Sequence, residues 1–590
     1  MSDMKIPGVN IVEKKAFPNS VVEVATAIPA FVGFTEKAEK GTQSLLNVPY
    51  RISSMVEYEK YFGGAPKNVE FDLIDGESMI ESIYEIIPNK CPEGYEMAGF
   101  PVSKYGQLTG LRDEYLKQYE NLQTNLVLGN HKYCLRNTKP LFTMYQHVKL
   151  YFANGGGSCY IISVGNYGGE LKQKAFEDGI ELLKKEQEPT LLVVPEAVNL
   201  DEDSCYTVNR KMLSHCGEMK NRFAILDIHD RYRASISSLA KKFGEKVGNE
   251  FLNYGSTYYP WLNTSSLDIQ KVSDFISKDS ILYLLISNKN WDRPDERLHK
   301  LYCFLLNSIY EYIEKTDKTD KDELKKMVCF CICSFDELFM KEVNILDGQP
   351  MYTPVIGAAK NGMPKLNEEE KNSLVAEWWK SRADEDIIQK SLRRIVNRLP
   401  ASAAMAGVYA RVDSTRGVWK APANVSLNMV ISPTVDITDD EQKDLNAPVD
   451  SDSKPINAIR HFVGSSIQVW GARTLDNKNL DWRYINVRRT MIFLEESIKN
   501  ATRSYVFEPN DANTWLNMKC MIENFLRDVW KRGGLAGASP EDAFQVHIGL
   551  GETMTPKDVV EGIMRISVLV AITHPAEFIE ISFQQQVQKS

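Results

Sequence analysis

Short apolar runs alternate with amphipathic segments between residues 151 and 230, and this alternation constrains the fold more than any other feature of the chain. A glycine turn followed by a strand-like run occupies residues 151–165, and further apolar runs lie within residues 190–198 and 222–230. A helical pattern at residues 170–188 separates the first two runs. Strands that alternate with helices are typical of a sheet covered by helices. We therefore predict an α/β layer here.

The length and charge of the chain limit the classes of protein to consider. At about 150 residues per domain, 590 residues suggest several domains. The net charge is −9, from 70 Lys and Arg against 79 Asp and Glu, so no nucleic-acid partner is expected. The longest aliphatic run, residues 566–572, is far shorter than the ~20 apolar residues of a membrane span. The first residues lack a basic start and an apolar leader segment. We expect a soluble chain without direct membrane insertion.

The C-terminal part has the clearest helical pattern. Two helices are predicted, at residues 487–505 and 515–531, each with one apolar stripe at spacings of three and four. The second helix has basic residues in its last turn and Gly533-Gly534 beyond it, a typical helix end. Thr555-Pro556 is typical of a helix start. Two strand-like pieces, residues 565–572 and 577–587, end the chain.

Glycine, cysteine and acidic clusters invite chemical interpretations that their spacing does not support. Residues 155–158, GGGS, lack the following Lys of a phosphate loop, so a structural turn is favoured. Residues 329–333, CFCIC, place thiols on one face of a strand rather than in CxxC metal knuckles. Residues 317–322 lack the central Gly of a calcium loop. We interpret these clusters as a turn, core thiols and a solvated linker.

The remaining candidates for catalysis are also weak. The polar stretch 436–454 begins with an acidic run, and we expect it to be a solvated loop. His229-Asp230 is interpreted as a hydrogen-bonding feature at a strand end. The chain contains no HExxH, GxSxG or CxxC motif. We therefore predict no catalytic residue, cofactor or metal, and no enzyme activity.

Several segments, in a fixed order, resemble contractile tail sheath proteins of phage tails and contractile injection systems. The signature segment is LPASAAMAGVYARVDSTRGVWKAPAN, residues 399–424. It is followed by VWGARTL, WRYINVRRT, FEPND and WKRGGLAGASPEDAFQV. The N-terminal half contributes IPGVNIVE, AFVGFTEKA, FANGGGSCYIISV, LLVVPE and YYPWL. The resemblance covers about residues 1–65, 147–262 and 399–590, and leaves two regions without a counterpart.

The resemblance implies a mechanical function. Such subunits stack as six-membered rings around an inner tube, in a strained extended state that contracts on a baseplate signal. The implied partners are other copies of the chain, the inner tube protein, and baseplate and terminal cap proteins. The particle would be assembled in the bacterial cytoplasm. Energy stored in the lattice requires no hydrolytic site.

The resemblance also implies a domain arrangement, of α/β (α+β multidomain) class. We expect an N-terminal linking arm at 1–26 and an outer α/β domain at 27–398, with insertions at about 66–146 and 263–398. An inner domain at 399–576 would combine with the N-terminal arm. A C-terminal linking arm would occupy residues 577–590.

Both chain ends are strand-like, and a terminal strand without a local partner can join the sheet edge of another molecule. In the sheath family the terminal arms link neighbouring subunits in this way. The residues assigned to this role are Ile11, Val12, Val22, Val24, Ile579, Ile581, Phe583 and Val587. The alternative is that these segments are ordinary terminal strands within one subunit.

The family also places a helix of the inner domain against the tube, and residues 515–531 are the best match. One face of this helix carries charged residues at spacings of four: Lys519, Glu523, Arg527 and Lys531. The alternative is a solvated face with i,i+4 ion pairs.

Two other classes of function stay open. A nucleotide-driven motor would need a complete phosphate loop, which is absent from the sequence. A surface adhesion or carbohydrate-binding module would use the insertions and bind a ligand without assembling. The sequence does not distinguish a phage tail from an injection system, although the insertions favour an injection system.

Overall fold

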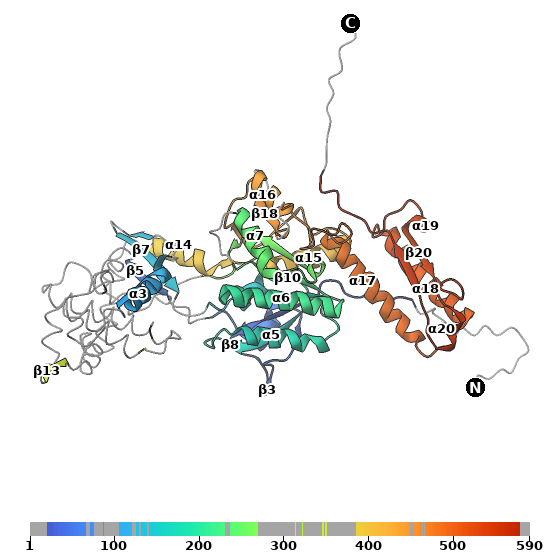
Figure 1. Cartoon of the computed structure of the whole chain (residues 1–590), viewed down its shortest axis with the longest axis horizontal. Coiled ribbons are helices and arrows are strands. Elements are labelled where there is room, and N and C mark those ends of the chain that lie inside the picture. Colours follow the sequence, from blue (N-terminus) through green and yellow to red (C-terminus); the bar gives the residue numbers. More distant parts are fainter. Residues whose placement is uncertain are drawn as a thin grey trace, which may run out of the picture. The chain divides into compact units, whose positions relative to one another are not determined.

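A computed structural model describes most of the chain outside its ends and the two regions without a family counterpart (Figure 1). The described residues are 20–66, 71–75, 87, 105–120, 126–128, 131–137, 141–229, 236–268, 313, 321, 345–346, 349–350, 385–448, 453–462, 464 and 466–578. Contacts divide the chain into two compact units. Unit 1 consists of Met1–Pro66, Phe142–Ser266 and Asn397–Ser590, and unit 2 of Lys67–Leu141 and Leu267–Val396.

A nine-stranded sheet forms the centre of unit 1, in the order β16-β19-β18-β11-β10-β9-β1-β8-β4. The strands are β1 (Pro29–Thr35), β4 (Tyr50–Ile52), β8 (Cys159–Asn166), β9 (Leu191–Val193), β10 (Phe223–Leu226), β11 (Gly255–Tyr259), β16 (Val425–Ser426), β18 (Asn457–His461) and β19 (Ile467–Val469). The six strands from β18 to β8 are parallel, and the pairs at both edges are antiparallel. All three runs predicted between residues 151 and 230 are strands of this sheet.

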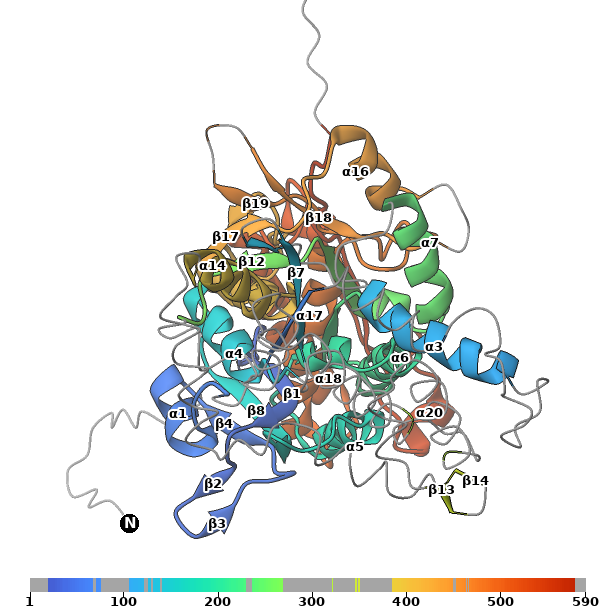
Figure 2. The same cartoon turned by 90° about the vertical axis from the view of Figure 1, so that its left-hand side faces the viewer.

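Helices cover both faces of the sheet. They are α4 (Met144–Ala153), α5 (Gln173–Leu182), α6 (Glu202–Met219), α7 (Ile236–Val247) and α15 (Ser402–Arg416). A Cβ on Gly179 of α5 would lie 2.6 Å from Val32, whereas one on Gly33 would lie 3.0 Å from Met144 of α4. Because neighbouring residues of a strand point to opposite faces, α5 and α4 lie on opposite sides of β1, as Figure 2 shows. This arrangement confirms the α/β fold class.

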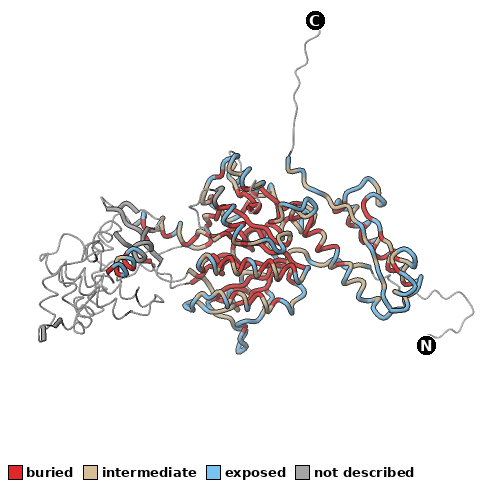
Figure 3. Tube along the Cα trace, viewed as in Figure 1, coloured by how far each residue is buried: buried red, intermediate tan, exposed pale blue. Residues whose placement is uncertain are grey.

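Burial on both faces explains the composition of the central strands. Every residue of β1 is buried, and the same is true of β9, β10 and β11. Parallel strands covered on both sides are nearly continuous in apolar residues. The red segments of Figure 3 mark this core. The apolar runs of the sequence therefore predict central strands correctly.

The sheet differs from the expected domain division in one respect. A boundary is expected at residue 399, yet β16, β18 and β19 follow that residue and join the sheet beside β11. Helix α15 also begins after it and packs against α4. Helix α15, which lies in the signature segment 399–424, is therefore part of the α/β layer. It packs so closely on α4 that a Cβ on Gly407 would lie 2.4 Å from the Tyr151 carbonyl.

The prediction of a solvated loop at 436–454 is wrong over its first half. Helix α16 (Asp439–Asn446) lies there. Its N-cap Thr438 and Glu441 form a reciprocal capping box, and three acidic residues in the first turn favour the helix dipole. Only Leu445 of the helix is buried, so the sequence of α16 has no apolar stripe from which a helix could be predicted.

The C-terminal subdomain, residues 485–576, belongs to unit 1. It contains α17 (Ile485–Thr502), α18 (Ala512–Lys531), the short helices α19 (Pro540–Ala543) and α20 (Pro556–Val560), and the strands β20 (Phe544–His547) and β21 (Ser567–Val570). Both predicted long helices are confirmed. Helix α18 ends at Lys531 with Arg532 as its C-cap, and Gly533 follows in the left-handed region at φ +81°. Thr555 caps α20 before Pro556.

Three smaller features complete unit 1. Strands β12 (Leu262–Thr264), β15 (Arg398–Leu399) and β17 (Val430–Pro433) form an antiparallel sheet. A small hairpin pairs β2 (Glu39–Lys40) with β3 (Gln43–Ser44), and helix α1 (Met55–Phe62) follows β4.

Unit 2 corresponds in sequence to the regions without a family counterpart, within a few residues at each boundary. Its described elements are β5 (Phe71–Asp75), α3 (Tyr105–Glu120), β6 (Leu126–Leu128), β7 (His131–Asn137), β13 (Ile345–Leu346), β14 (Gln349–Pro350) and α14 (Glu385–Val396). Strand β7 lies between β5 and β6 in an antiparallel sheet. The cysteine cluster 329–333 and the acidic residues 317, 320 and 322 lie outside the described residues.

Candidate functional site

The glycine turn at residues 155–158 packs against the protein itself. Gly155 has φ +98°, and a Cβ on Gly156 would lie 2.5 Å from the ring of Tyr151. The Tyr151 hydroxyl accepts a hydrogen bond from the Gly157 amide at 3.0 Å. An aromatic ring thus occupies the space beside the turn, which supports the interpretation as a structural turn.

The described residues offer no metal site and no membrane-spanning helix. No group of three or more His, Cys, Asp or Glu side chains able to hold a metal occurs in the described ranges. Within the same ranges, no helix is long and apolar enough to cross a bilayer. His229 donates through Nε2 to the Leu200 carbonyl at 3.0 Å, as expected for a strand-end residue.

Helix α18 carries the predicted row of charges. Its apolar stripe is buried at Met518, Ile522, Phe525 and Val529. Lys519 and Glu523 are half-buried, whereas Arg527 and Lys531 are exposed. In the described part of the chain none of these four charges forms an ion pair, so the i,i+4 pairs of the alternative interpretation are not formed.

The N-terminal segment 20–26 contacts the C-terminal subdomain but is not a strand. Val24 packs against the core of that subdomain, and its amide donates to Ser497 Oγ at 3.2 Å. Glu23 forms an ion pair with Arg532. Val22 is 76% exposed. Ile11 and Val12 lie outside the described residues.

A two-stranded hairpin lies near the other chain end. Strands β20 and β21 pair in antiparallel register from Phe544↔Val570 to His547↔Ser567, and they form a sheet of two strands among the described residues. The inner side chains Phe544 and Val546 belong to the core around α18. Ile579, Ile581, Phe583 and Val587 lie outside the described residues.

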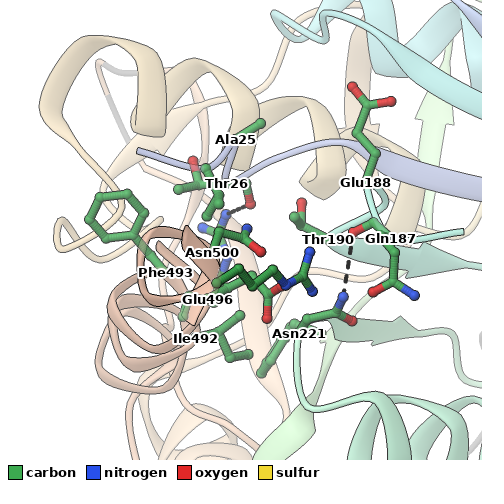
Figure 4. Close-up of a pocket in the computed structure, with 14 residues that line it drawn as sticks. Ala25, Thr26, Gln187, Glu188, Thr190, Asn221, Ile492, Phe493, Glu496 and Asn500 are labelled. Carbon is green, nitrogen blue, oxygen red and sulfur yellow. Dashed lines mark hydrogen bonds between the residues drawn. The ribbon is translucent and has the colours of Figure 1, made fainter. Parts of the chain in front are cut away.

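A cavity of about 450 Å³ lies between the N-terminal segment, α17 and the starts of β9 and β10 (Figure 4). Its walls combine apolar side chains such as Ile492 with amides and charges such as Asn221 and Glu496. Asn221 donates across one wall to the Gln187 carbonyl at 3.4 Å. The mixed lining does not resemble a catalytic constellation, since no nucleophile and base are paired there.

The residues that hold the two chain ends were not predicted from the sequence. Arg473 and Arg489 are buried, and they contact Glu577 and Thr26 respectively. One signal was present: two consecutive arginines, Arg488 and Arg489, follow Val487 on a helix with an apolar stripe. Buried arginine is rare unless it is paired, so such a position indicates a specific partner.

Comparisons with known proteins find similarity to contractile tail sheath proteins. Residues 477–586 match the family model described as phage tail sheath C-terminal domain. The tail sheath protein of Burkholderia phage BcepMu is 29% identical over 143 residues, which are 23% of this chain and 29% of the relative. The tail sheath protein of Vibrio phage KVP40 is 23% identical over 163 residues, 28% of this chain and 23% of the relative. The chain thus spans less than a third of either curated relative.

The solved structures extend the likeness to the whole fold. The sheath complex of the extracellular contractile injection system PVC, in its contracted state, matches with a TM-score of 0.52 and 23% identity over 100% of this chain and 99% of the other. The contracted helical sheath of the anti-feeding prophage matches with a TM-score of 0.51 and 24% identity over 98% and 99%. The resemblance to contractile tail sheath proteins is confirmed. None of these matches favours the adhesion alternative.

Proposed function

We propose that the protein is the sheath subunit of a contractile injection machine. Copies of the chain would form six-membered rings that stack around an inner tube and contract from a strained extended state to drive the tube into a target. The observation that carries this proposal is the match of the fold over nearly the full length of contractile sheath chains. The family match at residues 477–586 supports it independently through sequence.

The particle is proposed to be an injection system assembled in the bacterial cytoplasm. The chain resembles the sheath of the PVC injection system and the baseplate of the anti-feeding prophage over 98–99% of those chains. Baseplate, terminal cap and inner tube proteins would be the other partners. Stored lattice energy would drive contraction, so the subunit itself would act as a structural protein and not as an enzyme.

The chain ends are proposed to link neighbouring copies through the hairpin β20–β21. A two-stranded sheet has backbone N–H and C=O groups on its outer edges, and an extended segment from another copy can pair with them. The residues before Val22 and after Phe578 are the segments assigned to this role. Val24 packs against the core of its own subunit, so the N-terminal linking segment would consist of residues that precede Val24.

The tube-facing part is proposed to be smaller than residues 399–576. Residues up to Val469 contribute strands to the nine-stranded sheet, so the inner domain would consist of the C-terminal subdomain and the N-terminal segment. The remainder of unit 1 would form the outer α/β domain, and unit 2 would be the insertion. Helix α18 would contact the tube through Lys519, Glu523, Arg527 and Lys531, a weak contact repeated in every subunit of the stack.

Electron microscopy of the assembled protein tests this proposal. The full chain would be co-expressed with the candidate tube protein, next to a chain lacking residues 577–590. The control is a deletion of similar length within unit 2, which removes residues 351–362. Striated tubes from the full chain and the control, but not from the C-terminal truncation, are expected. A full chain that stays monomeric beside assembled tubes would contradict the proposal.

A further inference from the structure

The root of the C-terminal segment is held by a buried ion pair. Arg473 donates through Nε to Glu577 Oε1 at 3.0 Å and through Nη2 to Oε2 at 2.7 Å. The Arg473 side chain is 5% exposed and that of Glu577 is 19% exposed. Asn446 Nδ2 and the Tyr484 hydroxyl donate to the same carboxylate at 2.7 and 3.0 Å. Burial acts to raise the pKa of Glu577, but these donors outweigh it and leave the pKa below its usual value.

The root of the N-terminal segment is held in a similar way. Arg489 donates through Nη2 to the Thr26 carbonyl at 2.9 Å. The same guanidinium forms a two-point ion pair with Asp413 of α15, at 3.0 and 2.5 Å, and both side chains are at most 5% exposed. It also lies over the ring of Tyr409, 4.6 Å from its centroid. Thr26 and Glu577 are therefore each held by a buried arginine that has a bidentate carboxylate partner.

Side-chain contacts connect both roots to the same strand. The Arg473 amide donates to Asn457 Oδ1 at 2.7 Å, and Asn457 Nδ2 donates to the Thr257 carbonyl at 3.1 Å. From the other root, the Tyr409 hydroxyl bonds to the Tyr258 hydroxyl at 2.8 Å and to Ser256 Oγ at 3.1 Å. Residues 256–258 belong to β11, which lies inside the sheet between β10 and β18.

Buried ion pairs are weak sources of stability, because desolvation offsets much of their attraction. Their geometry is nevertheless specific, since a bidentate arginine fixes both the position and the orientation of a carboxylate. We therefore expect these two ion pairs to fix the positions of the segments rather than to add much to the stability of the fold.

We infer that the pairs Arg473–Glu577 and Arg489–Asp413 anchor the roots of the two linking segments to strand β11. Tension that neighbouring copies apply to either segment would then act on the interior of the sheet instead of peeling the segment from the subunit surface. The inference rests on the proposed sheath function. It assigns a positioning role to these four residues.

Hydrogen exchange of the full-length monomer tests the C-terminal anchor. The Thr474 amide donates to the Arg483 carbonyl and the Ile485 amide to the Ala472 carbonyl, so both report on the contact between Arg473 and Tyr484. In Glu577→Gln we expect these amides to exchange about tenfold faster or more, as for the loss of a charged hydrogen bond. The matched control is Glu561→Gln, an exposed carboxylate of the same subdomain with one ion pair at 3.6 Å, and its exchange should equal that of the wild type.

Assembly with the tube protein provides the second readout. Glu577→Gln sheaths should be shorter than wild-type sheaths or dissociate on contraction, whereas the Glu561→Gln control should match the wild type. A chain lacking residues 579–590 should keep slow exchange at Thr474 while failing to assemble. If the wild type and Glu577→Gln both form normal sheaths, the anchoring role of the ion pair is wrong and the proposed sheath function stands. Absence of sheaths from the wild type would overturn the proposed function and the anchor together.

Discussion

Replacement of Asn457 by alanine should destabilise unit 1 strongly, although it removes little apolar surface. Asn457 is 1% exposed and makes three hydrogen bonds through its side chain. Its Oδ1 accepts from the Arg473 amide at 2.7 Å. Its Nδ2 donates to the carbonyls of Thr257 and Arg473, at 3.1 and 2.8 Å. The side chain thus joins β18 to β11 and to the segment that holds Glu577.

The magnitude follows from these bonds. A typical intramolecular hydrogen bond contributes about 1 kcal/mol net, so the loss of three lowers the free energy of unfolding by about 3 kcal/mol. The Cβ of alanine cannot reach the freed groups. The Arg473 amide is buried, and a buried donor left without a partner keeps its desolvation penalty.

Urea unfolding of the monomer, followed by tryptophan fluorescence, measures the change. The matched control is Asn479→Ala, because Asn479 is exposed and its Oδ1 accepts one bond, from the Asp481 amide. We expect the control to shift the free energy of unfolding by less than about 0.5 kcal/mol. A loss below about 1 kcal/mol in Asn457→Ala would refute the reasoning, since it would mean that water replaces these bonds without penalty.

Three further predictions address pH, packing and the tube. Burial raises the pKa of Asp227 to about 7, so the stability that its protonated form contributes is present below about pH 4 and is lost as the pH rises through about 7. Thermal melts of Asp227→Asn should lack this decline in stability. A pH profile of the variant that equals that of the wild type would contradict the prediction. Gly407→Val should destabilise by about 1–3 kcal/mol in urea unfolding, because a Cβ there would lie 2.4 Å from the Tyr151 carbonyl; a neutral effect would refute the close crossing of α15 and α4. The double variant Arg527→Glu with Lys531→Glu reverses two charges of α18. It should no longer co-sediment with tubes, and its melting temperature should equal that of the wild type. Undiminished binding to tubes would exclude α18 as the tube contact.

The sequence predicts those elements whose apolar pattern and caps agree. Helix α18 combines its stripe with Gly533 after its end, so its C-terminus was located correctly. Its start was placed at residue 515, whereas the helix begins at Ala512 after the N-cap Asp511. The central strands could also be predicted, because burial on both faces makes them apolar throughout. Helix α16 was missed because its evidence lies in the Thr438 capping box and not in an apolar stripe. The place of residues 399–469 in the sheet depends on long-range pairing, which local periodicity does not encode.

The candidate site was only partly accessible from sequence. The charged row of α18 follows directly from helical spacing, and the structure places Arg527 and Lys531 on the surface. The anchors were not predicted, because Arg473 and Glu577 are about a hundred residues apart and neither has a distinctive local pattern. A buried ion pair across such a separation becomes visible only once the chain is folded.

Electron cryomicroscopy of the contracted particle tests the central claim most directly. We predict a helical sheath in which the hairpin β20–β21 is extended by strands from neighbouring copies, formed by residues before Val22 and after Phe578, with Glu577 still paired to Arg473. A hairpin that gains no strand from a neighbour, in a particle that is nevertheless a sheath, would contradict the linking mechanism. A particle in which this chain does not surround the tube would contradict the assignment as a sheath subunit.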